Sequence, residues 1–420
     1  MRYKRHCVRL SFFAAETDED DFTDPAKKEK IERLYRGFLI LRPTEPQIIG
    51  RSLISPKALK HRDFLACSTT VSTTVNSIKV CVEGFPHSSQ DAETIKCAET
   101  TIWALMEYYG SKYPEYKPVL PSTIIKQLNS LSYERQIPSN GLNIMQMSFA
   151  LKEFGFAPRI YAKEVYKDEF DKLLRIYIES GIPIVLGLEG GSIGHAVLCV
   201  GRNTITDKQI EALSESIKVS EDLSIYCWES LSPSCILIDD NHPVYQQASL
   251  NKPTSYYTEG HPDWKKCEIA HFLVPLYPKI YLEAFRAKQY VIQFLASSLL
   301  PIDNSELLVR LYLTSSRSFK NHVALSAELQ DNVRNMILET SMPKFIWVAE
   351  LSTKHDIKSK KANGLLIIDA TEANLNYNYP LLFAMYKHHV LTPDFESNTL
   401  EKKVVALSPF LIYEQNLKPA

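Results

Sequence analysis

The sequence has 420 residues, and its 48 Lys and Arg side chains are balanced by 49 Asp and Glu side chains, giving a formal net charge of -1. That length suggests two or three domains of about 150 residues each. The balanced charge provides no field that would attract nucleic acid or an anionic membrane, and the 45% hydrophobic content is typical of a soluble globular protein.

The first residues lack the pattern of a secretory signal, because the apolar run at 10–15 is short and is followed at once by acidic residues. The longest apolar window, at 290–300, is shorter than the about 20 residues that a membrane helix needs. Eight cysteines are scattered without a CxxC pair, and several lie in apolar runs where a free thiol packs as a small hydrophobic group. We therefore expect a cytoplasmic protein with reduced cysteines and no membrane-spanning segment.

Residues 1–83 are predicted to form an N-terminal arm and a β-rich lead-in. The charged stretch at 16–30 has few large apolar side chains and predicts a flexible arm or an exposed helix. Short strands are expected at 36–42 and 47–51, and the Thr-rich stretch at 64–82 has high β-propensity.

Residues 84–250 are predicted to form an α+β domain. Apolar side chains at helical spacing predict helices at residues 98–110, 141–155 and 167–180. Continuous apolar runs predict strands at residues 184–188, 195–200 and 235–240. A Gly-rich segment at 189–194 joins the first two strands as a hairpin, and the polar stretch that starts at 203 is interpreted as an insertion.

Residues 251–420 are predicted to form a mixed α/β C-terminal domain. A helix is expected at 279–300, and strands are expected at 345–351, 365–368 and 381–386. The whole chain is therefore expected to be an α+β protein in which a central domain lies between a β-rich N-terminal part and a mixed C-terminal part.

The helix expected at 98–110 begins beside Cys97, with Thr94 as its N-cap. Backbone amides and the helix dipole at such a position stabilise a thiolate, which is the nucleophilic form of cysteine. Cys97 is therefore a candidate nucleophile. The alternative is a buried structural thiol, which is the commoner role of a cysteine taken by itself.

His195 opens one predicted strand, and Asp239 and Asp240 close the next. If these strands pair antiparallel, the imidazole and a carboxylate meet at one end of the sheet. The carboxylate would then fix the tautomer of the imidazole while the other ring nitrogen accepts the thiol proton. Side chains alternate along a strand, so only one of Asp239 and Asp240 shares the face of His195, and the strand pattern leaves open which one it is. Taken singly, these residues also fit a capping histidine and ordinary turn aspartates.

This order of residues resembles the papain-like cysteine peptidases, and in layout most closely the bacteriocin-processing double-glycine peptidases. The resemblance covers about residues 84–250. It consists of Gln90 before Cys97, the helix after the cysteine, the helix at 141–155, Gly194-His195 followed by an apolar strand, and a strand that ends at Asp240. It implies a papain-like domain, in which a helix that starts at the cysteine packs on an antiparallel sheet.

In that family the cysteine is the nucleophile, the histidine is the base, an aspartate or asparagine orients the histidine, and an upstream glutamine donates an amide to the oxyanion hole. The resemblance implies these roles for Cys97, His195, Asp240 and Gln90, with the Cys97 backbone N–H as the second oxyanion donor. Gln90 stands one residue farther from the cysteine than is usual in the family, which predicts an extra residue bulging from the loop at 91–96.

Metal and cofactor sites are not expected. The histidines at 242, 261, 388 and 389 have no partner ligands at zinc-like spacing. The Gly-rich segment at 190–194 joins two strands and does not open a helix, which is contrary to a phosphate-binding loop.

The leading expectation is a thiol hydrolase that cleaves a peptide or isopeptide bond in a protein or peptide substrate through an acyl-enzyme at Cys97. The same residues can pass the acyl group to an amine, so an acyltransferase is an alternative. A second alternative is a catalytically idle papain-like fold that binds protein, and a third is an interaction protein whose binding function lies in residues 251–420. The sequence leaves the oligomeric state open.

Overall fold

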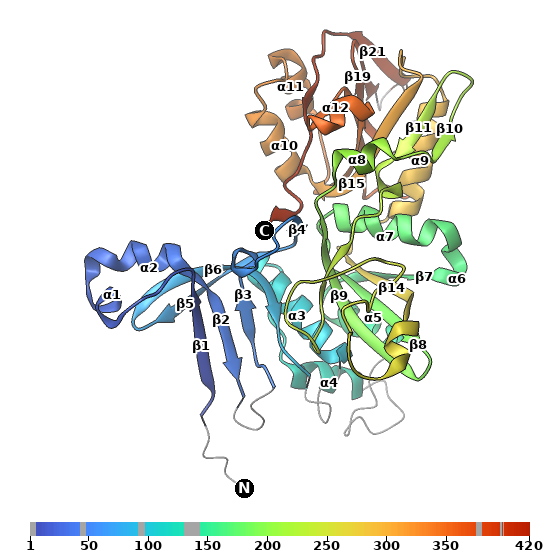
Figure 1. The fold of residues 1–420 in the computed structure, drawn as a ribbon. Helices are drawn as coiled ribbons and strands as arrows, with labels where there is room; N and C mark the ends of the chain where they lie inside the picture. Colours follow the sequence, from blue (N-terminus) through green and yellow to red (C-terminus); the bar gives the residue numbers. More distant parts are fainter. Residues whose placement is uncertain are drawn as a thin grey trace.

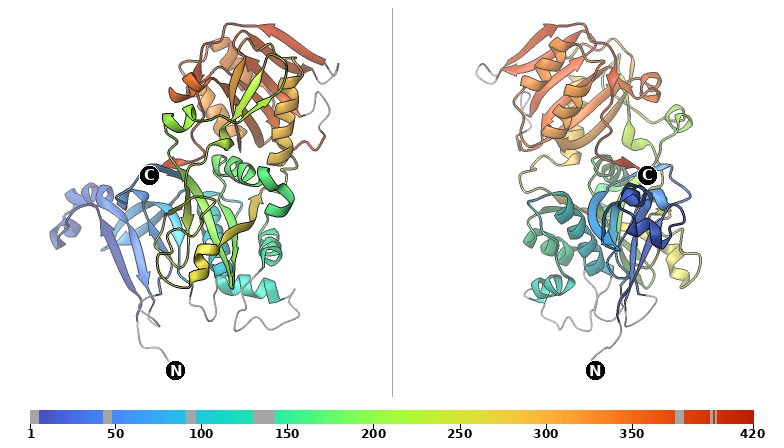
Figure 2. Two further views of the ribbon diagram at one scale, coloured as in Figure 1. Left: turned by 45° about the vertical axis from the view of Figure 1, so that its right-hand side comes forward. Right: turned by 90° about the vertical axis from the view of Figure 1, so that its left-hand side faces the viewer.

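The computed structural model describes residues 6–42, 48–90, 97–129, 143–374, 380–394, 397 and 399–420. Within these ranges the protein is a mixed α/β structure built on largely antiparallel sheets. Figure 1 shows an N-terminal sheet at the left, a central sheet with its helices at the lower centre and a C-terminal sheet above. The two further views in Figure 2 show the same arrangement, with the C-terminal sheet stacked on the central one.

The N-terminal sheet has five strands and carries two short helices. Its strands, in spatial order, are β1 (Val8–Phe13), β2 (Tyr35–Leu41), β3 (Ser52–Ile54), β6 (Ile78–His87) and β5 (Thr69–Val75). The helices are α1 (Glu19–Thr23) and α2 (Lys28–Leu34). Ile31 of α2 packs with Phe38 and Val80 in a small core of its own. Of the two structures expected for the charged stretch at 16–30, the helical one is therefore correct.

The central sheet holds the predicted hairpin and the strand that ends before Asp239. Its main path is β13 (Gln246–Ala248), β12 (Cys235–Ile238), β9 (Ile193–Asn203), β8 (Ile184–Gly190), β14 (Glu268–Leu276) and β7 (Ala157–Ala162). The short strands β4 (Phe64–Ala66) and β23 (Lys418–Pro419) extend it beside β9. Its helices are α3 (Cys97–Lys112), α4 (Pro121–Asn129), α5 (Ile144–Glu153), α6 (Lys163–Tyr166) and α7 (Phe170–Glu179).

Helix α3 runs through the middle of the protein and packs on β9 and β6. Every side chain from Ala98 to Tyr109 is buried, so the helix is enclosed on all sides. This explains why apolar residues occur around its whole circumference instead of along one stripe. A helix so enclosed holds its first residue, Cys97, in a fixed place relative to the sheet.

The C-terminal sheet has eight strands and a core of its own on one face. Its strands, in spatial order, are β10 (Ser216–Lys218), β11 (Ser224–Cys227), β15 (Glu306–Ser315), β16 (Phe345–Ser352), β18 (Gly364–Asp369), β19 (Leu381–Tyr386), β20 (His389–Asp394) and β21 (Thr399–Val404). Its helices are α8 (Asp207–Glu211), α9 (Ala284–Ala296), α10 (Ser316–Leu325), α11 (Asp331–Glu339) and α12 (Lys354–Lys358). A separate small pair joins β17 (Lys361–Ala362) to β22 (Phe410–Leu411).

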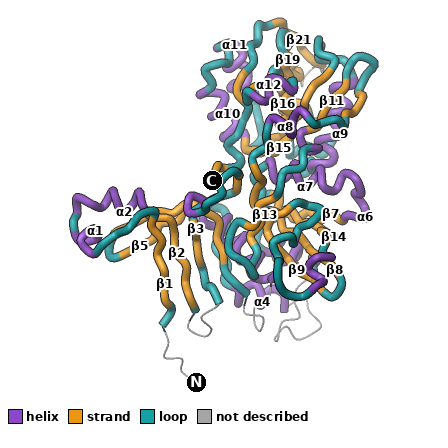
Figure 3. The backbone as a smooth tube through the Cα atoms, viewed as in Figure 1, coloured by secondary structure: helices purple, strands orange, loops and turns teal. Residues whose placement is uncertain are grey.

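Two segments cross the expected domain boundaries, as the tube in Figure 3 lets the reader follow. The polar stretch after residue 203, interpreted as an insertion, supplies β10 and β11 to the C-terminal sheet, where β11 pairs parallel with β15. Strand β14 lies beyond residue 250 but pairs with β8 and β7 in the central sheet. The span of the central sheet is therefore wider in sequence than 84–250.

A buried charge network links the two large sheets. Glu179 at the end of α7 accepts hydrogen bonds from Arg202 on β9, at 2.7 Å, and from Arg310 on β15, at 2.6 Å. Arg310 also donates to Glu350 on β16, at 2.7 Å. Each charge is paired, which is the condition under which charged groups tolerate burial.

Short 3-10 turns occur at Pro25–Lys27, Pro56–Ala58, Lys167–Glu169, Trp228–Ser230 and Pro262–Lys266.

Among the residues that the structure describes, no helix has both the length and the apolar character required to cross a bilayer.

Candidate active site

Cys97 is the first residue of α3, and its half-buried side chain packs at the margin of the main core. The hydroxyl of Thr101, one turn farther along, donates to the carbonyl of Ala196 on β9 at 3.2 Å. Because Ala196 adjoins His195, this hydrogen bond fixes the first turn of α3 beside the start of β9. The expected N-cap Thr94 and the loop at 91–96 lie outside the described residues.

The hairpin of β8 and β9 positions His195. Pairing is antiparallel, with Leu188 opposite His195, and Gly191 takes a positive φ of 59° in the connecting turn, a conformation that glycine adopts without strain. The imidazole of His195 is buried, and the Cys97 thiol is close enough to it to help raise the pKa of His195. The structure thus brings together the two residues expected to act as nucleophile and base.

Asp239, and not Asp240, makes the close contact with His195. Strands β9 and β12 pair antiparallel, as expected, with Ile238 opposite Leu198. Continuing this register places Asp239 opposite Val197, on the face that His195 occupies. Asp239 Oδ1 lies 3.0 Å from His195 Nε2, whereas Asp240 Oδ1 lies 3.8 Å away. The preference for Asp240 is corrected in favour of the alternative.

Hydrogen bonds outweigh burial in setting the charges of His195 and Asp239. Burial alone would lower the pKa of His195, but its hydrogen bonds with Asp239 and Cys97 raise that pKa well above 6.5. Burial alone would raise the pKa of Asp239, but the hydrogen bond and charge of His195 lower it to about 2. Both shifts favour the charged forms, an imidazolium facing a carboxylate. Since Nε2 faces Asp239, the other ring nitrogen is left for the thiol.

Asp240 has the opposite electrostatic behaviour from its neighbour. Burial raises its pKa to about 7, the charge of His195 opposes that rise, and the charge of Asp239 adds to it. Neither carboxyl oxygen has a hydrogen-bond partner of ordinary geometry among the described residues. The pKa values of the two adjacent aspartates thus shift in opposite directions, because hydrogen-bond donors surround the carboxylate of Asp239 and not that of Asp240.

Two tyrosines that the sequence analysis did not identify also hold Asp239. The hydroxyls of Tyr256 and Tyr257 both donate to Asp239 Oδ2 at 2.8 Å. The ring of Trp264 stacks on that of Tyr257, with centroids 3.9 Å apart, and meets the imidazole of His195 edge-on. These residues lie beyond position 250, where the peptidase-like domain was expected to end. The Tyr-Tyr pair in an otherwise polar loop was the available signal.

The loop that carries these aromatic residues is fastened to the β8–β9 turn. Asp263 accepts hydrogen bonds from the backbone N–H of Ser192 at 3.1 Å and from its hydroxyl at 3.0 Å. The turn that aims His195 and the loop that covers it are therefore joined directly.

The turn after Asp239 is supported from the N-terminal sheet. His87, at the end of β6, is buried and its Nε2 donates to the carbonyls of Asp239 and His242, each at 3.1 Å. Burial lowers the pKa of His87, which favours the neutral ring. The ring of His242 packs edge-on against Tyr257.

Gln90 lies at the edge of the same network. Its side-chain N–H donates to Asn241 Oδ1 at 2.6 Å, while the backbone N–H of Asn241 donates to Asp239 Oδ1 at 2.9 Å. The structure therefore connects Gln90 to the residues around His195. The extra residue predicted in the loop at 91–96 falls outside the described residues.

His195, Asp239 and Asp240 are also the described residues that come closest to a metal site, since one ligand atom from each lies within 4.8 Å of the others. Both oxygens of Asp239 are already occupied, by His195 and Asn241 on one side and by the two tyrosines on the other. A carboxylate so saturated by donors suits the orientation of an imidazole better than the coordination of a cation.

Comparison with known protein families gives no matching family, and comparison with curated proteins gives no match from which a function could be carried over. Any functional assignment therefore depends on the side chains themselves.

Proposed function

We propose that the protein is a thiol hydrolase of papain-like architecture that cleaves a peptide or isopeptide bond through an acyl-enzyme at Cys97. The observation that carries this proposal is geometric: Thr101 fixes the first turn of α3, which begins at Cys97, beside the start of β9, where His195 lies 3.0 Å from Asp239. A thiol at a helix start, an imidazole and a buried carboxylate form the set used for thiol-based acyl transfer.

In the proposed reaction, His195 holds the thiol proton as an imidazolium, and Cys97 Sγ attacks the carbonyl carbon of the scissile bond. The negative charge that develops on the carbonyl oxygen would be stabilised by the backbone N–H of Cys97 and by the amide of Gln90. His195 then returns the proton to the leaving amine, and a thioester on Cys97 remains. Water, deprotonated by His195, hydrolyses the thioester and restores the free thiol.

Asp239 supports these steps as a positioning residue. Its Oδ1 holds His195 Nε2, and Tyr256 and Tyr257 hold the carboxylate in turn. This support keeps the imidazolium stable while the tetrahedral intermediate exists.

The alternative of a catalytically idle binding module rests on Gln90, whose amide is engaged by Asn241. If that hydrogen bond persists when a substrate binds, the oxyanion hole has only the backbone donor. An acyltransferase differs from a hydrolase only in the nucleophile that receives the acyl group, so the same site serves both.

The test is the rate at which iodoacetamide alkylates each cysteine of the full chain at neutral pH, followed by peptide mapping. We expect half-buried Cys97 to react faster than the exposed Cys7 and Cys81, because the imidazole of His195 lies beside its thiol. The variant His195→Gln should abolish that advantage without changing the rates at Cys7 and Cys81. Equal rates at the three cysteines in the unaltered protein would contradict the proposal.

A peptidase assay provides the second arm. A library of fluorogenic peptides and isopeptide-linked substrates should be cleaved by the unaltered protein and not by Cys97→Ala. Fast alkylation of Cys97 without cleavage or acyl transfer by any substrate would favour the binding module.

A further inference from the structure

A cavity among the described residues lies at the other end of α3, away from Cys97. Its volume is about 630 Å³, within the range of pockets that enclose small organic ligands. It is bounded by the end of α3 and the segment that follows, by the start of α10 and by the residues before β16. At about 1.5 Å per residue, α3 separates Lys112 from Cys97 by roughly 22 Å, so the cavity is distinct from the candidate active site.

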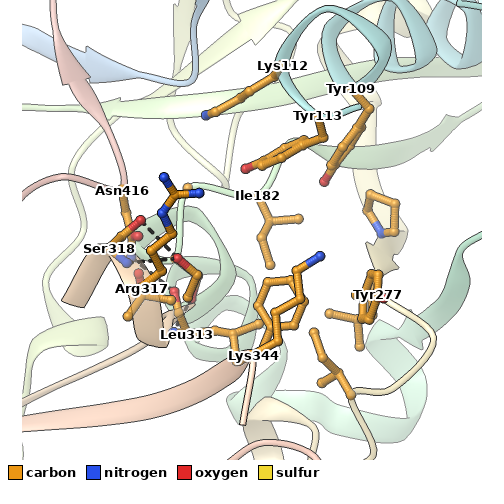
Figure 4. Close-up of a pocket in the computed structure, with 18 of the residues that line it drawn as sticks. Tyr109, Lys112, Tyr113, Ile182, Tyr277, Leu313, Arg317, Ser318, Lys344 and Asn416 are labelled. Carbon is orange, nitrogen blue, oxygen red and sulfur yellow. Dashed lines mark hydrogen bonds between the residues drawn. The ribbon is translucent and has the colours of Figure 1, made fainter. Parts of the chain in front are cut away.

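Positive charge gathers in this cavity. Lys112, Arg317 and Lys344 line it from three different elements, and Glu115 is the one acidic side chain among the described lining residues. Figure 4 shows the side chains of Lys112 and Arg317 on the side of Asn416 and the Lys344 ammonium on the side of Tyr277. Three positive charges and one negative charge leave a formal surplus of two positive charges.

The three cationic side chains differ in the hydrogen-bond and ion-pair partners that they have. Lys344 pairs with Glu115 at 2.6 Å, whereas the Lys112 ammonium donates to the uncharged Tyr108 hydroxyl at 2.6 Å. Arg317 is exposed, and none of the hydrogen bonds or ion pairs found among the described residues involves its guanidinium. Burial and the charge of Lys418 lower the pKa of Lys112, so an anion nearby would stabilise its charged form.

Flat aromatic surfaces make up much of the remaining wall. Tyr109 and Tyr113 are stacked with centroids 5.8 Å apart, and Tyr277 lies across the cavity with Lys344 4.7 Å above its ring. Tyrosine faces of this kind pack well against planar rings, while the apolar side chains of Ile182 and Leu313 fill the floor.

From this combination we infer that the cavity binds a small phosphate monoester that carries a planar ring, the chemical class to which nucleoside monophosphates belong. A phosphate monoester has a charge between about -1.5 and -2 at neutral pH, which matches the formal surplus in the cavity. Arg317 and Lys112 contact the phosphate, and the tyrosines pack on the ring. This inference does not depend on the proposed peptidase activity.

The experiment is calorimetric titration of the full chain with adenosine monophosphate and with phenyl phosphate, each compared with adenosine and with inorganic phosphate. Both ring-bearing phosphates should bind, and adenosine and inorganic phosphate should bind at least about 10-fold more weakly, because each lacks one half of the recognised chemistry. Phenyl phosphate binding alone would identify the ring as a simple aromatic and still support the inference. Absence of binding by both ring-bearing phosphates would overturn it, as would inorganic phosphate binding as tightly as they do.

Variants locate the site. Arg317→Glu should weaken binding of the ring-bearing phosphates by at least about 10-fold, since it both removes a cation and adds a repulsive charge. Arg286→Glu is the matched control, because Arg286 is exposed on α9 and does not line the cavity. Equal losses in the two variants would contradict the assignment. Cys97→Ala should bind like the unaltered protein, so the titration stays informative if the peptidase proposal fails.

Discussion

Asp239 and Asp240 are adjacent in sequence and both buried, yet their pKa values shift in opposite directions. Asp239 receives four hydrogen bonds and has its pKa lowered to about 2, while the pKa of Asp240 is raised to about 7 by burial. A raised pKa means that the fold favours protonated Asp240. Its contribution to stability is complete below about pH 4 and is lost as the pH rises through about 7.

The first prediction follows from that sign. Asp240→Asn cannot ionise, so its free energy of unfolding should rise relative to that of the unaltered protein between pH 4 and 8. The gain should be a few kcal/mol, since one pKa unit corresponds to about 1.4 kcal/mol. Urea unfolding at several pH values measures it, with exposed Asp222→Asn as the control that shows no pH-dependent gain. If the free energies of unfolding of Asp240→Asn and the unaltered protein depended on pH in the same way, the raised pKa of Asp240 would be contradicted.

For Cys97 we predict a substitution that removes activity and leaves the stability of the fold nearly unchanged. Cys97→Ala should remove all hydrolytic activity, because no other side chain replaces the nucleophile. Its free energy of unfolding should fall by less than about 1 kcal/mol, since a half-buried thiol at a helix start leaves little cavity. Thermal unfolding checks this, with Ile102→Ala as the comparison that creates a true core cavity. A loss of several kcal/mol at Cys97 would favour a structural thiol.

Gln90 leads to a graded expectation. If its amide leaves Asn241 to donate to the oxyanion, Gln90→Ala should lower kcat by about 10²-fold to 10³-fold with KM nearly unchanged. Asn241→Ala separates the two roles of the hydrogen bond, because it frees the Gln90 amide without removing it. A Gln90→Ala variant as active as the unaltered protein would leave the Cys97 backbone N–H as the remaining proposed donor.

Among secondary-structure elements, the loop before β14 has the most direct influence on the candidate site. Tyr257→Phe removes one donor from Asp239, so the pKa of Asp239 should rise. The carboxylate, with one donor fewer, should stabilise the imidazolium more strongly and raise the pKa of His195. The alkaline limb of the activity profile should then move to higher pH. Tyr245→Phe is the matched control, because the buried hydroxyl of Tyr245 donates to Ile54 and accepts from Phe85, away from Asp239. An unchanged alkaline limb in Tyr257→Phe would show that the tyrosines only pack.

Local sequence patterns were sufficient to predict α3, the β8–β9 hairpin and β12, because each is specified by its own periodicity or turn residues. They did not distinguish Asp239 from Asp240, since the pairing of β12 with β9 shifts register between Ile236 and Leu237. The position of β14 between β8 and β7 depends on partners far along the chain, which no local pattern encodes. For the same reason Tyr256 and Tyr257 were missed: their loop acquires its role only when β14 joins the sheet.

For the chain as a whole, the ion pairs and hydrogen bonds around Arg310 connect the two large sheets. Arg310→Met should lower the free energy of unfolding by about 3 to 5 kcal/mol, because Glu179 and Glu350 would remain buried with fewer partners. Denaturant unfolding measures the loss, and exposed Arg286→Met should show almost none. A small effect at Arg310 would mean that water enters the network and replaces the guanidinium.

The strands of the central sheet come from distant parts of the chain, which has a consequence for the rate of folding. Strand β4, at Phe64–Ala66, pairs both with β9 and with β23 at Lys418–Pro419, so neighbouring strands come from almost opposite ends of the described chain. Pairings over such sequence separations require closure of very long loops, and proteins dominated by them fold slowly. During synthesis, Cys97 and His195 emerge from the ribosome well before Tyr257 and β14. Cys97 is therefore synthesised before the residues whose contacts fix His195. A newly made chain passes through a period in which the cysteine is present but His195 is not yet held in place beside it.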